Sequence, residues 1–407
     1  SKGPAAALRP RVHHDDASAD ADAGEERYIV VLEDADAAID AEQDQLLRDL
    51  DAQNADAADP AFRARVSADV RQVLHAVVAD LSDEALAFVR ARPEVAFVEV
   101  DAWVGATTPA SRRLTTQNGA TWGLDRIDQR DLPLSGTYTY TNTGANVDAY
   151  IVDTGVLFTH NAFGGRAVAG WYPPALGTAS DCDGHGTHVA GTVAGTTHGV
   201  AKGAKIVGVR VLGCDGSGSN ADVISGIEYS ANAAKNSNRR GVINMSLGGG
   251  FSSALNNAVS GAVAKGVPVV VAAGNEAEDA CGSSPASSVD AITVAASSSS
   301  DGGASFTNYG SCVDIIAPGV SITSAYVDAN NLSRNNVYAS LSGTSMASPH
   351  VAGAVVRLLQ ASPALTPSQA KVAVLCAAST GRISSLPGSG TPNRLLYYAP
   401  TGMPVAA

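Results

Sequence analysis

The stretch LSGTSMASPHVAG, residues 341–353, places one serine among small residues, four positions before a proline. The residues after Pro349 have the apolar spacing of a helix, and proline is tolerated in a helix's first turn, where backbone N–H groups have no partner. We therefore expect a helix to begin near Ser345, with the hydroxyl beside free N–H donors at the positive end of the helix dipole. A serine in this position is usually an N-cap. It becomes a nucleophile where a base and oxyanion donors lie close by.

Three further segments carry the groups that a serine nucleophile needs. YIVDTGV places Asp153 directly after a run of apolar residues. DGHGTHVAGTVAG places His185 and His188 at the start of a helix of small residues, and VAAGNEAE supplies the amide of Asn275. Acyl transfer by serine requires a base within hydrogen-bond reach, a group that orients the base, and donors for the oxyanion. These residue types meet that requirement if the fold brings them together.

The elements that must position these groups follow an α/β pattern from about residue 122 onward. Short apolar runs alternate with helix-length segments, which is typical of parallel strands buried on both faces. An open parallel sheet presents its active groups at the carboxyl ends of the strands, where Asp153, Ser246 and Asn275 fall. The sequence predicts strands at 147–153, 204–212, 241–247, 266–273, 291–296 and 312–319, and helices at 220–236 and 252–265.

The N-terminal part has a different character. Residues 1–26 are polar and rich in Ala and Asp, which predicts a disordered lead-in. Residues 27–101 alternate strand and helix patterns and predict a small α+β domain, and residues 102–121 read as a flexible connector. The predicted strands are 27–33, one within 70–82, and 94–101, and the predicted helices are 36–50 and a segment that starts at Ser82 and ends before Pro93.

Charge separates the same two parts. The net charge is −13, and 23 of the 40 acidic but only 12 of the 27 basic residues precede Thr115. An acidic chain of this kind argues against binding to nucleic acid. No apolar run reaches membrane-spanning length. The chain starts at Ser1 without a basic-then-apolar segment, so we expect that a leader has been removed.

Five cysteines are present, at 182, 214, 281, 312 and 376, and none forms a C-x-x-C pair. The pattern disfavours a zinc knuckle or a thioredoxin-like site. Two bridges with one thiol left over would suit an exported protein, although the spacing alone allows many pairings. Cys376 lies in a helix-like segment and is expected to be a small core residue.

Taken together, the blocks YIVDTGV, GHGTHVAGT, NMSLGGG, AAGN and SGTSMASPHVAG resemble those of the subtilases. Three more stretches, TWGLDRIDQRDLPLSGTYTY, RVLGCDGSGS and SFTNYGSCVD, are similar to the branch that includes proteinase K and aqualysin. The resemblance covers about 122–398. It implies a subtilisin-like parallel β-sheet flanked by helices, preceded by a small α+β (ferredoxin-like) propeptide domain. It also implies a secreted serine endopeptidase.

Roles carry over from the resemblance residue by residue. Asp153 would orient His185, which takes the proton of Ser345, while Asn275 and the Ser345 backbone N–H receive the oxyanion. Two glycine-rich segments would hold an extended peptide by β-strand addition, and small residues would line the specificity pocket, which implies broad cleavage after apolar or aromatic residues. The implied substrate-binding residues are Gly216, Ser217, Gly218, Ser246, Leu247, Gly248, Ala272, Ala273 and Gly274.

The resemblance further implies two disulfides and structural calcium. The disulfides are Cys182–Cys214 and Cys281–Cys312. Oxygen ligands of the kind that the resemblance points to suit a hard cation. One implied calcium site comprises the carbonyls of Val289 and Ala291 with the Asp314 carboxylate, and the second comprises Asp125, Asp128 and Gln129.

The implied organisation is that of a self-processing zymogen. Residues 27–104 would be a propeptide inhibitor and folding chaperone, 105–121 a linker cut near 114/115, and 122–400 the peptidase domain. We expect a monomer that acts on protein or peptide substrates and uses its own propeptide as an intramolecular inhibitor.

Three rival hypotheses stay open at this point. A zinc hydrolase could use Asp183, His185 and His188, but HGTH lacks the glutamate and the four-residue histidine spacing of a metalloprotease helix. An esterase of the α/β-hydrolase type needs Gly-x-Ser-x-Gly, and Ala347 stands in place of the second glycine. A non-catalytic binding protein could keep the fold, although every candidate catalytic residue is present.

Overall fold

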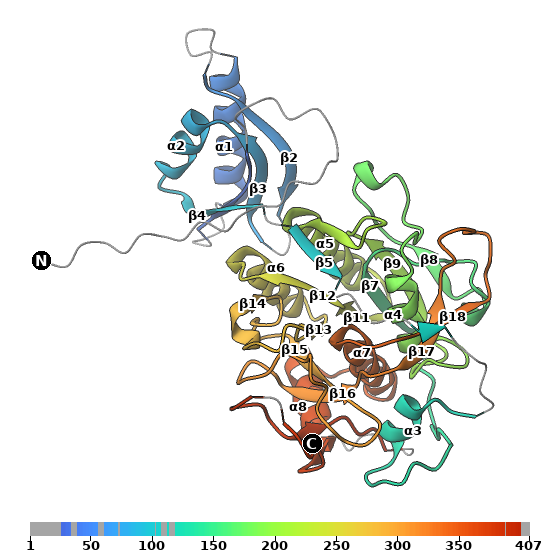
Figure 1. The fold of residues 1–407 in the computed structure, drawn as a ribbon. Helices are drawn as coiled ribbons and strands as arrows, with labels where there is room; N and C mark the ends of the chain where they lie inside the picture. Colours follow the sequence, from blue (N-terminus) through green and yellow to red (C-terminus); the bar gives the residue numbers. More distant parts are fainter. Residues whose placement is uncertain are drawn as a thin grey trace, which may run out of the picture.

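The computed structural model describes residues 26–33, 39–55, 61–71, 74–101, 103–106, 112–113, 119–386 and 388–399. The predicted lead-in, apart from Glu26, lies outside these residues, as do residues 114 and 115 at the predicted cleavage point. Two bodies are visible in Figure 1, a small one near the N-terminus and a larger one. The elements that carry Asp153, His185 and Ser345 all belong to the larger body.

The larger body is built on a nine-stranded sheet in the order β19-β20-β16-β15-β13-β11-β7-β9-β8. All neighbouring strands in it are parallel except β19 and β20. The predicted α/β class is therefore confirmed. The strands are β7 (Val147–Asp153), β8 (Ala167–Ala169), β9 (Lys205–Arg210), β11 (Arg240–Met245), β13 (Val269–Ala272), β15 (Ile292–Ser297), β16 (Ile315–Pro318), β19 (Ser379–Thr380) and β20 (Arg394–Leu395).

Helices cover both faces of this sheet because its strands are apolar on both faces (Figure 1). Along β7, Ala149 and Ile151 belong to the core formed with α4 (His185–Ala194) and α7 (Thr344–Ala361). The alternate residues, Tyr150 and Val152, belong to the core formed with two other helices. These are α5 (Asn220–Asn236) and α6 (Ser253–Ala264).

The start of α7 corrects two expectations about its serine and proline. The N-cap is Gly343 and no side chain caps the helix, so the N-cap interpretation of Ser345 is wrong. Pro349 lies in the second turn, not the first. Proline has no N–H to give to the carbonyl four residues earlier, and that carbonyl, Ser345 O, instead accepts the Ser246 hydroxyl at 2.9 Å.

The small body is a four-stranded antiparallel sheet, in the order β2-β3-β1-β4, with two helices. One face of the sheet packs with its own helices, and residues of the other face, such as Ile29 and Val31, belong to the same core as α5 and α6. β2 was not predicted as a separate strand. The elements are β1 (Glu26–Leu32), α1 (Ile39–Asn54), β2 (Ala64–Val70), β3 (Ala76–Leu81), α2 (Asp83–Arg90) and β4 (Val95–Val100).

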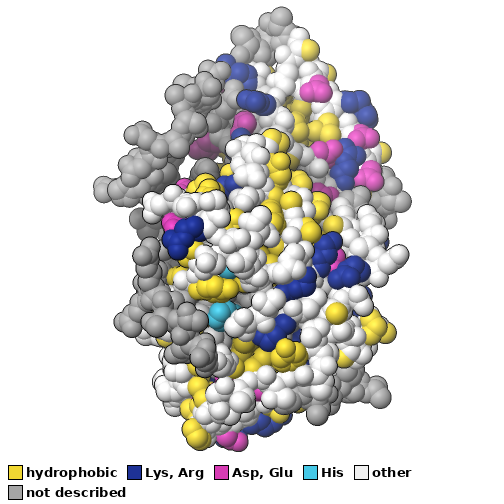
Figure 2. Space-filling model, turned by 90° about the vertical axis from the view of Figure 1, so that its right-hand side faces the viewer, with side chains coloured by type: hydrophobic (Ala, Val, Ile, Leu, Met, Phe, Trp, Pro, Cys, Tyr) yellow, Lys and Arg dark blue, Asp and Glu magenta, His cyan; other side chains and the backbone are white. Residues whose placement is uncertain are grey.

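Acidic side chains follow the same division. On the face shown in Figure 2, most of the visible Asp and Glu side chains gather on the upper part, at the height of the small body.

Ser82 caps α2 by accepting the Ala85 N–H, as the sequence predicts.

The shorter elements complete the larger body. Helix α8 buries a stripe at Ala370, Ala373, Val374 and Ala377, and Cys376 lies off this stripe and is exposed. The prediction that Cys376 is a core residue is therefore wrong. These elements are α3 (Trp122–Asp128), β5 (Trp103–Ala106), β6 (Arg112–Arg113), β10 (Ser217–Ser219), β12 (Leu247–Gly250), β14 (Ser283–Ser284), β17 (Ile322–Tyr326), β18 (Val337–Leu341), α8 (Pro367–Ala377) and 3₁₀ turns at Asn161–Phe163, Pro174–Leu176 and Ala280–Gly282.

Candidate active site

An aspartate and a histidine meet where β7 ends and α4 begins. Asp153 is the last residue of β7 and His185 the first of α4. The His185 Nδ1 lies 2.7 Å from Asp153 Oδ1, and the two side chains are 3% and 0% exposed. The same carboxylate oxygen accepts the Thr154 N–H at 2.7 Å. The carboxylate therefore fixes the orientation and the tautomer of the imidazole.

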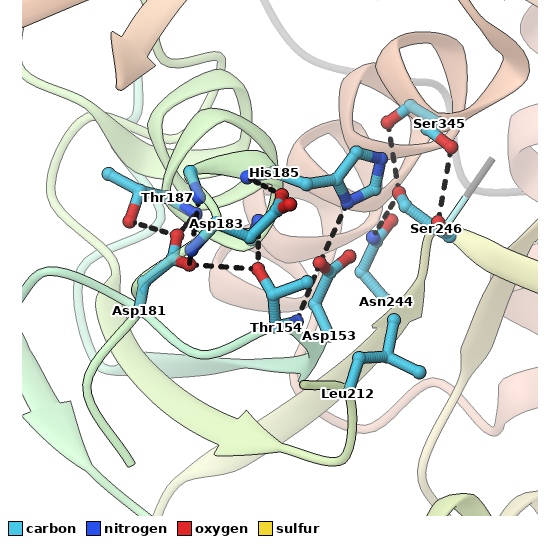
Figure 3. A network of polar contacts seen from close by, with 12 residues as sticks. Asp153, Thr154, Asp181, Asp183, His185, Thr187, Leu212, Asn244, Ser246 and Ser345 are labelled. Atoms are coloured by element: carbon cyan, nitrogen blue, oxygen red, sulfur yellow. Dashed lines mark hydrogen bonds and ion pairs between the residues drawn. The ribbon is translucent and has the colours of Figure 1, made fainter. Parts of the chain in front are cut away.

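The protonation of His185 is set by two opposing effects. Burial lowers the pKa of His185, but the charge and the hydrogen bond of Asp153 outweigh it, and the pKa is raised overall. The other ring nitrogen, Nε2, is buried and makes no hydrogen bond to the described part of the chain. Figure 3 shows the ring between Asp153 and Ser345. This is the arrangement of a base with one nitrogen held and the other available to accept a proton.

The Ser345 side chain is buried at the second position of α7 and is held against the end of β11. Its Oγ donates to the Ser246 carbonyl at 3.1 Å, and the Ser246 hydroxyl donates back to the Ser345 carbonyl at 2.9 Å (Figure 3). Ser246 is itself fixed by Asn244 Nδ2 at 3.0 Å and by the Ser348 hydroxyl at 2.8 Å. The sequence did not predict that Asn244 and Ser348 hold the Ser246 hydroxyl.

Two N–H donors border one small space beside this serine. Asn275 Oδ1 accepts the Thr344 N–H at 2.8 Å and the Thr344 hydroxyl at 2.9 Å. Its Nδ2 is thereby turned away from Thr344 and is buried without a hydrogen-bond partner in the described part of the chain. A Cβ added to Gly343 would lie 3.6 Å from both Asn275 Nδ2 and Ser345 N. Two N–H donors that border one point have the geometry of an oxyanion hole.

A buried carboxylate that the sequence analysis missed holds the histidine helix in place. Asp181 accepts hydrogen bonds from the Thr154 hydroxyl at 3.0 Å, the Gly184 N–H at 2.9 Å and the Thr187 N–H at 2.9 Å. It thus ties the end of β7 to the start of α4. Burial raises the pKa of Asp181 to about 6. The sequence offers only a weak signal for Asp181, namely an acidic residue shortly before a helix of small residues.

His188 has a structural role rather than a catalytic one. Its Nε2 lies 2.9 Å from the Ile322 carbonyl and 3.2 Å from the Ala339 carbonyl. Burial lowers the pKa of His188 to about 3, so the ring is neutral and donates to the strands β17 and β18. Because the strands use His188 Nε2 and Asp153 holds His185 Nδ1, the geometry does not support the zinc hydrolase hypothesis. Among the described residues, no three His, Cys, Asp or Glu side chains cluster to hold a metal.

The predicted substrate segments form the two sides of a short antiparallel sheet in the order β10-β5-β12-β14. β5, from the N-terminal part, pairs with β10 on one side and with β12 on the other. Figure 1 shows β5 beside β12. Gly218 is opposite Val104 and Gly248 is opposite Gly105, while Ala106 is opposite Leu247, the residue after Ser246. The pocket residues Ala272, Ala273 and Gly274 follow at the end of β13, with φ +106° at Gly274, and Gly216 turns into β10 with φ +77°.

Both disulfides are present in the pairing that the resemblance implies. Cys182 pairs with Cys214 and Cys281 with Cys312. The first bridge joins the loop before α4 to the loop before β10, and Arg210 Nη2 lies 3.1 Å from Cys182 Sγ. It therefore connects the loop before His185 to the loop that leads into β10.

The two implied calcium sites differ. The oxygens of Val289, Ala291 and Asp314 do converge, but the Lys371 ammonium lies among them, at 3.1 Å, 2.6 Å and 2.9 Å. These residues do not fit a calcium ion as they stand, and the expectation for this site is corrected.

The second set lies on α3 and faces the loop at 135–139. Asp125 accepts the Ser135 and Gly136 N–H groups, Asp128 accepts the Thr139 N–H, and Gln129 Oε1 accepts the Ser135 N–H. Burial, followed by the charge of Asp125, raises the pKa of Asp128. Carboxylate and amide oxygens are ligand types that suit a hard cation.

A serine, a histidine and an aspartate at the carboxyl edge of a parallel sheet, with two oxyanion donors, define a serine hydrolase. Residues 132–395 match the model of the subtilase family, Peptidase S8. The chain belongs to the subtilase family. The predicted family and the serine endopeptidase activity are thereby confirmed.

Relatives agree with this assignment. The chain is 50% identical over 336 residues to the extracellular serine proteinase of Thermus sp. (strain Rt41A), covering 82% of this chain and 78% of the relative. It is 46% identical over 321 residues to the alkaline serine exoprotease A of Vibrio alginolyticus, covering 79% of this chain and 58% of that relative. A cold adapted subtilisin-like serine proteinase of known crystal structure matches with a TM-score of 0.64 at 48% identity, covering 69% of this chain and 98% of the other.

Proposed function

We propose that this subtilase is made as a secreted zymogen that cuts itself and is inhibited by its own N-terminal domain until that domain is removed. The observation that carries the proposal is the position of β5 between β10 and β12. A peptide paired with both strands occupies the place where an extended substrate would add to the sheet. Among the described residues, no helix has the length and apolar character needed to cross a membrane. One relative is named an extracellular serine proteinase, which supports secretion.

The proposed mechanism assigns one role to each group. Ser345 Oγ attacks the peptide carbonyl carbon while His185 Nε2 takes the hydroxyl proton, and Asp153 stabilises the imidazolium that forms. Asn275 Nδ2 and the Ser345 N–H receive the negative oxygen of the tetrahedral intermediate. His185 then gives the proton to the leaving amine as the C–N bond breaks, and a water molecule releases the acyl group by the same route in reverse.

The docking of the N-terminal domain supports its role as an inhibitor. Its carboxylates meet the starts of two helices: Asp101 accepts the Ala221 N–H of α5 at 2.9 Å, and Glu99 accepts the hydroxyl of Ser252, the N-cap of α6. Anionic groups are stabilised at helix N-termini. The domain is thus anchored beside both strands that hold β5.

Two arguments bear on the position of the cut, and they indicate different peptide bonds. Residue spacing places the mature start near Thr115. The register of β5 places its end, Ala106, opposite Leu247, next to Ser246. Because the Ser246 carbonyl accepts Ser345 Oγ at 3.1 Å, we propose that the first cut falls shortly after β5 and that trimming then produces the start near Thr115.

Intact mass of the full chain after incubation tests this proposal, with Ser345→Ala as the matched variant. We expect the wild type to yield fragments that separate after residue 106–108, followed by a second species that begins near Thr115, and the variant to stay whole. An uncut wild type would reject self-processing. A single cut at 114/115 would reject only the order of events.

The proposed specificity is broad, with apolar or aromatic residues before the cut. The proposed pocket residues at 246–248 and 272–274 are all small or apolar, and none is charged. A peptide library should show cleavage after residues such as Leu or Phe. A strong preference for Lys, Arg or Asp there would contradict the proposed pocket.

We also propose one structural calcium ion, at Asp125, Asp128 and Gln129. The loop that these side chains hold precedes the first strand of the large sheet, so the ion would stabilise the start of the domain. Asp128→Asn should abolish the calcium-dependent part of the thermal stability, and equal calcium dependence with and without the substitution would reject the site.

A further inference from the structure

A lysine side chain lies where the family resemblance implies a metal ion. Lys371, on α8, places its Nζ 2.6 Å from the Ala291 carbonyl, 3.1 Å from the Val289 carbonyl and 2.9 Å from Asp314 Oδ2. An ammonium has three N–H donors and no acceptor. All three donors are therefore satisfied by these three oxygens.

The ammonium and a calcium ion exclude each other from this place. Calcium takes six to eight oxygen ligands at roughly 2.3–2.6 Å, and the three oxygens that converge here already face Lys371 Nζ. A second cation within a few ångströms of the ammonium would be repelled by it. One positive charge balances the Asp314 carboxylate.

We propose that Lys371 is a built-in cation that replaces calcium at this site. The lysine is covalently attached, so its contribution to stability does not depend on the concentration of free ion, whereas that of a bound metal does. The Lys371 and Asp314 side chains are 21% and 20% exposed. The contact is thus largely shielded from water and salt.

The contact also joins three parts of the fold that are distant in sequence. Ala291 directly precedes β15, Asp314 directly precedes β16, and Lys371 reaches both from α8. Asp314 Oδ2 accepts the Thr293 N–H as well, at 2.9 Å. The cation therefore fixes the entry of two neighbouring strands into the sheet.

The test removes the lysine charge and asks whether calcium takes its place. The full chain with Ser345→Ala serves as an uncut background, and Lys371→Met is added to it, with Lys205→Met as the matched control. Lys205 lies 3.9 Å from its acidic neighbour, Asp148, and is 42% exposed. Thermal unfolding and calcium binding by equilibrium dialysis are measured in a chelator and in millimolar calcium.

We expect Lys371→Met to lower the Tm in the chelator by about 2–4 °C. In millimolar calcium the Tm of this variant should return to that of the background, and the variant should bind one more calcium ion than the background does. Lys205→Met should match the background in both measurements. If Lys371→Met binds no additional calcium, the three oxygens are not a cation site and the proposal is wrong.

A second variant keeps the test decisive if Lys371→Met does not fold. Asp314→Asn in the same background removes the carboxylate without touching the lysine. We expect the number of bound calcium ions to stay the same, because calcium does not use this carboxylate. Loss of one bound ion in Asp314→Asn would show that calcium displaces the lysine and would overturn the proposal.

Discussion

The orientation of the Asn275 amide depends on a neighbouring hydroxyl, and Thr344→Val tests how much catalysis depends on it. The hydroxyl of Thr344 donates to Asn275 Oδ1 at 2.9 Å and accepts the Gly274 N–H at 3.2 Å. Valine has nearly the same shape and removes only the hydroxyl. The Thr344 backbone N–H still holds the amide at 2.8 Å. The substitution therefore loosens the oxyanion donor without removing it.

The size of the effect can be bounded from these contacts. A neutral hydrogen bond contributes about 0.5–1.5 kcal/mol, which corresponds to a loss of roughly 2–13-fold in kcat. The upper limit is complete loss of the Asn275 donor, about 10²–10³-fold, a figure known for the corresponding subtilisin residue and not worked out from this structure. Because the donor acts only on the oxyanion, KM should stay nearly unchanged. The buried Gly274 N–H loses its partner, so the free energy of unfolding should also fall by about 1–3 kcal/mol.

The assay is kcat and KM on a peptide substrate for Thr344→Val, Thr344→Ser, Asn275→Ala and the double variant Thr344→Val/Asn275→Ala. Serine keeps the hydroxyl and should keep most of the activity. In the absence of Asn275, the valine should cause no further loss of kcat. Equal losses for valine and serine, or losses that multiply in the double variant, would show that the hydroxyl does not act through the amide.

Three further predictions concern stability in the Ser345→Ala background. Burial lowers the pKa of His350 to about 4, so only the unfolded chain takes up a proton between pH 6.5 and 4, and stability is lost as the pH falls. At pH 5 this lowers the free energy of unfolding by about 2 kcal/mol. In urea unfolding, the loss of this free energy between pH 7 and pH 5 should be smaller for His350→Asn. Arg126 is fully buried, with two bonds to Asp301 at 2.7 and 3.0 Å. Arg126→Met leaves that carboxylate unpaired and should cost about 3–5 kcal/mol; a loss below 1 kcal/mol in urea unfolding would contradict the argument. Replacing Cys182 and Cys214 together with alanine opens a loop of 32 residues, and should cost about 3–4 kcal/mol in the chain-entropy model, whereas an unchanged urea midpoint would refute it.

The catalytic residues could be predicted because each lies at the end of an element with a strong local pattern. Asp153 closes an apolar strand, and His185 and Ser345 lie in the first turns of helices rich in small residues. Parallel strands bring such ends to one edge. The pattern around Pro349 helped to predict the start of α7, although the proline lies in the second turn. Because Pro349 has no N–H, the Ser345 carbonyl is left to accept the Ser246 hydroxyl.

Lys371 and Asp181 could not be predicted in the same way. A lysine on a helix surface usually reaches solvent, and nothing local marks the one that meets carbonyls about 80 residues earlier in the chain. Asp181 belongs to no periodic pattern or motif. Its role comes from the hydrogen bonds that it accepts from Thr154, Gly184 and Thr187 in the folded chain. The strand β5 is a third example, because a short segment becomes a strand there only when two partner strands are supplied by another body.

The contacts that dock the N-terminal domain also set the register of β5. Ser219 is opposite Trp103 in the β10–β5 pairing. Asp101 lies two residues before Trp103, and its partner Ala221 two residues after Ser219, so the bond between Asp101 and the start of α5 continues the same antiparallel register. A slip of one residue would break this bond and change which residue of β5 is opposite Leu247. The hydrogen bond between Asp101 and the start of α5 therefore supports the register that brings the end of β5 next to Ser246. In the proposed zymogen, docking of the domain would present the chain to the nucleophile.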